Sequence, residues 1–138
     1  MAIPFPSDEW IKALCAELNA SAAYREAART WEGDFVFVVE PAGKLKETVY
    51  LYMDLWHGQC REAFMLKDPA EKDAAFRMSA PANTWREVIE ARLDPLKGLM
   101  VRKLKLKGNM SMIMRSVKAA QELVKCCTQI ETIFLADS

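Results

Sequence analysis

The sequence predicts a mixed α+β domain built on one mainly antiparallel sheet. Five short stretches have the composition or the alternation of β-strands, and Gly, Pro, Asn or Asp residues punctuate the chain between them. Apolar residues recur at helical spacing near both ends of the chain and once between the fourth and fifth strands. The 138 residues, about half of them apolar, suit a single domain, 1–138, with a substantial core.

Residues 1–32 are expected to form two N-terminal helices. Ser7 is placed to cap the first helix, and the two acids that follow it favour the helix dipole. The apolar stripe of this helix is Trp10, Ile11, Leu14, Cys15 and Leu18. A second, short helix is capped by Asn19 or Ser21 and is ended by Gly33. Its apolar face is Tyr24, Ala27, Ala28 and Trp31.

Four strands follow these helices. Their predicted ranges are residues 35–39, 48–56, 60–66 and 73–79. The second of them is apolar on both faces, so it should be central in the sheet and covered on each side. Short turns at His57-Gly58 and at residues 68–71 join the last three strands, which predicts an antiparallel meander.

A helix opens the second half of the chain. A capping box at Thr84 and Glu87 starts it, and it runs to about Leu93. Asp94 ends this helix, because the residue before a proline is pushed out of the helical conformation. Residues 96–100 are expected to form a further helical turn.

The last part of the chain combines a strand and a helix. Residues 103–107 alternate strictly, with two leucines facing inward and three lysines facing outward, as in an edge strand. A glycine-asparagine turn then starts a last long helix that is expected to end after Cys127. Residues 128–138 are a C-terminal extension that continues the helix or packs elsewhere as a tail.

Charge, hydropathy and cysteine content exclude several classes of protein. The 19 basic and 19 acidic residues cancel, which argues against non-specific nucleic-acid binding. The apolar runs are too short to span a bilayer, and residues 1–10 lack the regions of a secretory signal. Cys15, Cys60, Cys126 and Cys127 follow neither a disulfide framework nor paired zinc-binding motifs. We therefore expect a cytoplasmic protein without a metal or cofactor.

The candidates for catalysis are few, and no catalytic motif is present. His57 and Cys60 have the spacing of a hairpin, so a polar turn residue and an idle thiol account for them better than a nucleophile or a metal site does. Asp54 lies in an apolar strand, either as a buried acid or as the partner of an arginine or a backbone group. We therefore expect that the protein is not an enzyme.

One basic run stands out in the second half of the chain. It consists of Lys97, Arg102, Lys103, Lys105 and Lys107. A solvated face of the edge strand accounts for it, and a transient contact with anionic lipid headgroups at a membrane surface is the alternative.

Methionines gather in the same part of the chain. Met100, Met110, Met112 and Met114 fall within fifteen positions. Methionine is flexible and polarizable, and it suits surfaces that accept varied apolar partners. Met110 and Met114 share one helical stripe whereas Met112 lies off it, which indicates a helix that is apolar on two sides. This pattern fits a ligand pocket and a plain core equally well.

The stretch from Asp94 to Asn109 combines an aspartate-proline pair, a short helical turn, a lysine-leucine-lysine run and a glycine-asparagine turn. The residues concerned are Asp94, Pro95, Met100, Lys103, Leu104, Lys105, Gly108 and Asn109. This stretch resembles the sterol carrier protein 2 (SCP-2) family, and the resemblance extends over roughly residues 31–126. Arg102 stands where that family often has a glycine.

The resemblance implies a five-stranded, mostly antiparallel sheet covered by helices, with an apolar tunnel between them. It also implies non-enzymatic binding or transfer of a lipid, namely a sterol, a fatty acid, a fatty acyl-CoA or a phospholipid. The residues expected to line the tunnel are Phe35, Phe37, Trp85, Ile89, Met100, Leu104, Met112 and Met114. The alternative is an interaction module without a lipid ligand, which forms a homodimer through an apolar surface such as residues 130–135.

Overall fold

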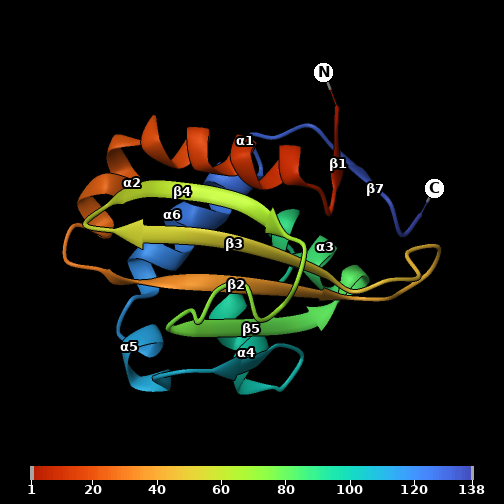
Figure 1. Cartoon of the computed structure of the whole chain (residues 1–138). Coiled ribbons are helices and arrows are strands. Elements are labelled where there is room, and N and C mark those ends of the chain that lie inside the picture. The colour runs from red at the N-terminus through yellow and green to blue at the C-terminus, as the bar shows by residue number, and fades with distance from the viewer. Residues whose placement is uncertain (1, 138) are drawn as a thin grey trace.

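A five-stranded mixed sheet forms the centre of the computed structural model, which describes residues 2–137 (Figure 1). The strands are β2 (Glu32–Glu40), β3 (Val49–Trp56), β4 (Gln59–Leu66), β5 (Phe76–Pro81) and β6 (Lys105–Lys107). Their spatial order is β4-β3-β2-β5-β6, with β2 and β5 parallel and the other pairings antiparallel. The predicted α+β class with a mainly antiparallel sheet is therefore confirmed.

The position of β5 corrects the predicted meander. Strands β2, β3 and β4 form the meander, and β5 then returns to the far side of β2. The outer edge of β4 is closed to a further strand because helix α1 (Asp8–Asn19) lies along it. The Asn19 side-chain amide bonds both backbone groups of Cys60, at 2.8 and 2.9 Å. The Asp8 carboxylate accepts the Met65 N–H at 2.9 Å.

The connection between β4 and β5 covers one face of the sheet. The Arg77 guanidinium holds this connection by donating to the carbonyls of Pro69 and Lys72 at 2.6 and 2.8 Å. Strand β3 lies between β4 and β2, and it is buried on both faces, with Met53 at 0% and Tyr52 at 4% exposure. The apolar pattern of this strand therefore correctly predicted that both of its faces are covered.

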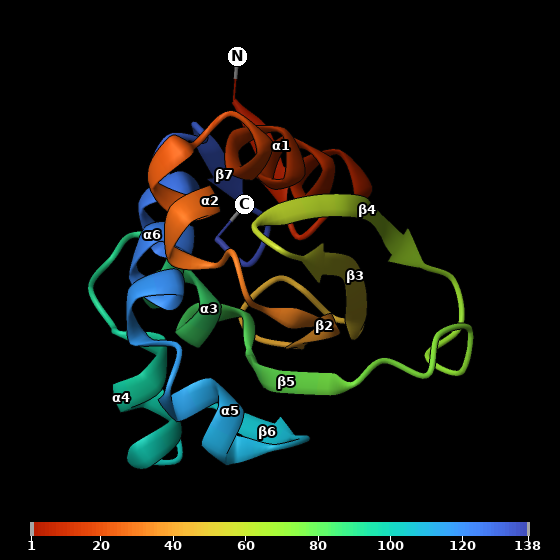
Figure 2. The ribbon, with the colours of Figure 1, turned by 90° about the vertical axis from the view of Figure 1, so that its left-hand side faces the viewer.

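Helices cover the other face of the sheet. Helices α1, α2 (Ala22–Ala27), α3 (Ala82–Ile89) and α6 (Val117–Cys127) enclose the main core against it (Figures 1 and 2). Helices α4 (Pro95–Met100) and α5 (Met110–Met114) lie with β6 at the lower end of both views. Ser7 caps α1, as the sequence predicted, and Ser21 rather than Asn19, the other predicted candidate, caps α2. Gly33 lies within β2, because α2 ends earlier, at Ala27.

The two ends of the chain meet in a second, two-stranded sheet. Strand β1 (Ile3–Phe5) pairs in parallel with β7 (Thr132–Phe134), which lies in the predicted C-terminal extension. The Trp10 indole N–H donates to the Thr132 hydroxyl at 3.0 Å and ties this small sheet to α1. The extension is therefore held against the N-terminus of its own chain rather than continuing the last helix.

Three helix boundaries differ from the prediction. Helix α3 begins before Thr84 without a side-chain cap and ends at Ile89, so the capping box is not used. Asp94 does not end a helix but caps α4, accepting the Leu96 N–H at 2.8 Å. The expected long last helix is broken into α5 and α6, because the Ser116 hydroxyl donates to the Met112 carbonyl at 2.8 Å and competes with the helical bonding pattern.

Candidate functional site

An apolar cavity lies between the helix-covered face of the sheet and the helices α3 to α6. Its volume is about 100 Å³. The sheet contributes Phe35, Phe37, Leu55 and Met78 to its wall. The helices and their connections contribute Tyr24, Trp31, Trp85, Val88, Pro95, Leu96, Ile113, Ser116, Ala119, Ala120, Leu123 and Val124. The wall is almost wholly apolar, which is the character of a site for a hydrophobic ligand.

A chain of aromatic rings forms the floor of this cavity. Phe35 stacks on Phe37 at 5.2 Å and on Trp31 at 5.8 Å between ring centroids. Phe37 meets the Trp85 ring edge-on at 5.7 Å. Both indoles are fixed by hydrogen bonds to main-chain carbonyls. The Trp85 N–H donates to the carbonyl of Val38, and the Trp31 N–H donates to the carbonyl of Gly33, each at 2.9 Å. The rings are therefore held in place whether or not a ligand covers them.

Tight packing behind the rings also fixes their position. Gly33 allows the Phe76 ring to approach the backbone of β2, because a Cβ at this position would meet that ring at 2.7 Å. Phe76 in turn stacks on Phe35 at 5.0 Å. A side chain at position 33 would therefore displace the floor of the cavity.

The few polar groups at the cavity are not arranged for chemistry. The Ser116 hydroxyl already donates to a main-chain carbonyl. Burial raises the pKa of the Tyr24 phenol, so that it stays protonated and uncharged. The cavity can thus hold an apolar group, and it presents no charged group to act on one.

A second, polar hollow of about 360 Å³ adjoins the apolar cavity. The two share Trp31, Ser116 and Ala119 as common walls. Arg115 and Lys118 bring positive charge to the polar hollow, while its acid is Glu32. The remaining lining residues are Ala27, Ala28, Thr30 and Met112. A polar chamber with two cations therefore lies against the wall of an apolar one.

The structure brings together three of the eight residues that the sequence predicted as lining. Phe35, Phe37 and Trp85 all face the apolar cavity. Met112 lines the polar hollow instead. Ile89, Leu104 and Met114 pack in or against the core but are not among the lining residues.

Met100 lies outside the cavity, with 73% of its surface exposed. The reason is that α4 packs inward through Leu96 and Leu99 and ends at Met100, where the chain turns outward through the exposed residues Val101 and Arg102. Sequence reasoning also missed the part of the wall that α6 supplies. Its small residues Ala119 and Ala120 leave room, and that pair was the signal available in the sequence.

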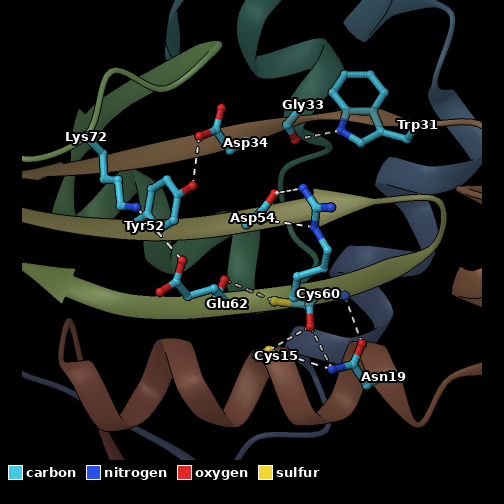
Figure 3. Close-up of polar contacts among 11 residues, drawn as sticks. Cys15, Asn19, Trp31, Gly33, Asp34, Tyr52, Asp54, Cys60, Glu62 and Lys72 are labelled. Atoms are coloured by element: carbon cyan, nitrogen blue, oxygen red, sulfur yellow. Dashed lines mark hydrogen bonds and ion pairs between the residues drawn. The ribbon is translucent and has the colours of Figure 1, made fainter.

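The residues weighed as catalytic each have another partner. The Arg61 guanidinium donates to both Asp54 oxygens, at 3.1 and 3.2 Å. His57 is half exposed, and its ring lies 2.6 Å from Glu32. Burial raises the pKa of the Cys60 thiol, whose backbone is bound by Asn19 (Figure 3). These contacts are those of structural residues.

Two further features of residues 2–137 bear on function. None of their groups of His, Cys, Asp and Glu side chains could hold a metal ion. No helix in this part of the chain has the length and apolar character needed to cross a membrane.

Comparison with known proteins identifies the family. The model of the SCP-2 sterol transfer family matches residues 11–121, which is most of the chain. The chain belongs to the SCP-2 sterol transfer family. This agrees with the resemblance of the stretch from Asp94 to Asn109. Among curated proteins, no match was found.

Solved structures share the fold over most of the chain. A crystal structure of sterol carrier protein 2 is 41% identical, covers 90% of this chain and 97% of its own, and has a TM-score of 0.78. A solution structure from Thermus thermophilus, described as possibly a sterol carrier protein, is also 41% identical. It covers 91% of this chain and 88% of its own, with a TM-score of 0.82.

The same fold also occurs inside a larger protein. The sec-alkylsulfatase Pisa1 from Pseudomonas sp. matches 80% of this chain with 15% of its own length, at 16% identity and a TM-score of 0.55. This likeness extends to the fold alone. Together the comparisons support a lipid-binding or carrier fold.

Proposed function

We propose that this protein binds and carries a lipid, holding its apolar part in the cavity between sheet and helices. The ligand is a fatty acid, a fatty acyl-CoA, a sterol or a phospholipid. The observation that carries the proposal is the cavity wall, which is aromatic and aliphatic and has rings fixed in place. An unfilled space among such side chains forfeits contacts that a ligand would restore. Membership of the SCP-2 family supports a lipid as that ligand.

The cavity has to widen to accept a whole lipid. Its volume of about 100 Å³ is small, since pockets for drug-sized ligands measure about 300–1,000 Å³. Among helices α3 to α6, α5 buries the fewest side chains, with only Ile113 of its five buried. The break at Ser116 separates it from α6. We infer that α5 moves outward on this break when a ligand enters.

The adjoining polar hollow suits the polar end of the same ligand. Arg115 has no ion-pair partner among the described residues, and Lys118 shares Glu122 with Lys125. Glu32, the acid of this hollow, is held by His57. A carboxylate or phosphate placed here would meet positive charge while its apolar chain lies behind Trp31.

The test is lipid loading measured by native mass spectrometry and by extraction of the purified protein. The decisive variant is Ala120→Trp, which fills the cavity from α6. Its matched control is Ala23→Trp, an exposed position on α2. We expect lipid bound to the wild type and to the control, and none bound to Ala120→Trp.

A second variant keeps the test valid if Ala120→Trp does not fold. Met112→Glu puts an acid into the polar hollow at a half-buried position that packs against the main core without being part of it. It should weaken the binding of an anionic lipid while the circular dichroism spectrum of the folded protein stays unchanged. Equal loading of wild type, Ala120→Trp and Met112→Glu would contradict the proposal.

A further inference from the structure

Positive charge is concentrated in one part of this otherwise neutral chain. Residues 95–121 contain seven of the 19 basic residues and none of the 19 acidic ones. Six of the seven form no ion pair with any residue in the described range 2–137, namely Lys97, Arg102, Lys103, Lys105, Lys107 and Arg115. Elsewhere, basic residues such as Lys12, Arg61 and Arg92 lie beside acids. The unpaired charge is therefore free to attract an anionic partner.

Exposed apolar side chains lie among these cations. Met100, Val101, Met110 and Val117 are exposed by 73, 56, 40 and 44%. They are four of the seven large hydrophobic side chains that are exposed within residues 2–137. Leaving such side chains in water is unfavourable, so a gathering of them marks a contact surface.

These residues lie at one end of the molecule. Helix α4, strand β6 and helix α5 form its lower end in two views at right angles (Figures 1 and 2). We call the exposed side of residues 97–117 the basic face. Lysines 105 and 107 stand on the edge strand β6, which pairs with β5 on one side only. The cations and the apolar side chains are thus presented together.

The turn after α4 is shaped to expose this mixture. Arg102 has a left-handed backbone with φ 64°, a conformation that glycine adopts at lower cost. This turn reverses the chain between the buried Leu99 and the buried Leu104, and it leaves Met100, Val101 and Arg102 outside. An arginine in a conformation that suits glycine places a further charge beside two exposed apolar side chains.

We propose that the basic face docks on the surface of an anionic lipid bilayer. The cations would bind lipid phosphates, and the methionine and valine side chains would enter the boundary between headgroups and acyl chains. A bilayer fits better than an acidic protein surface, because the apolar side chains are interspersed with the cations rather than gathered into one pocket. The proposal rests on the proposed carrier function, which requires a place where lipid is exchanged.

The basic face is also the outer side of the cavity wall. Pro95 and Leu96 of α4, Ile113 of α5 and Ser116 line the apolar cavity from the same segment. Contact with a bilayer would therefore act on the wall element that has to move when lipid enters. Docking and opening would take place at the same site on the molecule.

Co-sedimentation with vesicles tests the docking. The probes are vesicles of phosphatidylcholine alone and of phosphatidylcholine with phosphatidylglycerol. We expect the wild type to bind only the anionic vesicles and to be released by high salt, because salt screens exposed charges. The triple variant Lys103→Glu, Lys105→Glu, Lys107→Glu should bind at least about tenfold more weakly. The control Lys44→Glu, Lys46→Glu, Lys67→Glu changes net charge equally and should bind like wild type.

A second pair of variants tests the apolar part. Met100→Ser with Val101→Ser should weaken binding to anionic vesicles, whereas Met65→Ser with Ile133→Ser, exposed elsewhere, should not. Absence of wild-type binding to anionic vesicles would overturn the proposal, as would equal binding by the two triple variants. Binding to duplex DNA but not to vesicles would also overturn it.

Failure of docking is distinguishable from failure of the carrier function. Binding of a monomeric fluorescent fatty acid, measured without vesicles, reports the cavity alone. The Lys103, Lys105 and Lys107 triple variant should retain this binding and lose transfer from anionic vesicles. Ala120→Trp should show the opposite pattern, with docking intact and fatty-acid binding lost.

Discussion

The region where α1 lies along β4 and the region formed by α4, β6 and α5 contrast in how their side chains are used. Helix α1 buries four large apolar side chains and bonds the edge of β4 at both of its ends, through Asp8 and Asn19. The α4–β6–α5 region consists of three short elements with unpaired lysines and exposed methionines, and it backs onto a cavity. The first region holds the fold together, and the second is left free to bind and to move.

Truncation of a core side chain should show the largest difference between these regions. Leu18 of α1 is completely buried, so Leu18→Ala should lower the free energy of unfolding by about 2–5 kcal/mol. Met100→Ala in the other region removes an exposed side chain and should change it by less than about 0.5 kcal/mol. Urea denaturation followed by circular dichroism measures both. Equal losses would show that the two regions are equally important for stability.

Removal of the contact between α1 and β4 should have the next largest effect. Asn19→Ala leaves the backbone N–H of Cys60 without its partner and its carbonyl with only the weak donor Cys15, which should cost about 1–3 kcal/mol. Asn83→Ala, at an exposed position on α3, is the matched control and should be nearly neutral. Hydrogen exchange at the Cys60 amide should quicken in Asn19→Ala alone. Unchanged protection there would contradict the role given to this amide.

Alkaline pH should weaken the packing of helix α6 in the main core through the buried thiol of Cys127. Burial raises the pKa of Cys127 to about 12. An ordinary cysteine in the unfolded chain loses its proton near 8.5, so the unfolded state binds fewer protons between these values. Stability should therefore be complete below about pH 8.5 and fall as the pH rises toward 12, by about 1.4 kcal/mol at pH 9.5.

Unfolding of wild type and Cys127→Ala at pH 7 and pH 9.5 isolates the contribution of this thiol. The loss between the two pH values should be smaller in Cys127→Ala. Alkylation gives a second measure, because a thiol with such a pKa is inert at pH 8 until the chain unfolds. Rapid modification of Cys127 in the native protein would contradict its burial.

Much of the fold could be predicted from local patterns, because alternation and helical spacing depend on neighbouring residues only. The strands of the sheet, the caps at Ser7 and Ser21, and the short turn at α4 all follow from such patterns. The stretch from Asp94 to Asn109 carried the resemblance to the SCP-2 family, which the family model confirms. Phe35, Phe37 and Trp85 were predicted to lie together, and they do.

The sequence by itself thus determined the elements, their apolar faces and the family, since these depend on residues that are close together in the sequence. Tertiary structure decided which elements distant in the sequence are neighbours. Strand β5 pairs with β2 because α1 already occupies the edge of β4. No local sequence pattern indicates that α1 lies there. The cavity wall likewise combines residues from Tyr24 to Val124, whose proximity is set by long-range packing. Met100, although typical of a ligand pocket in sequence, lies on the outer surface because α4 packs inward through Leu96 and Leu99 and ends at Met100.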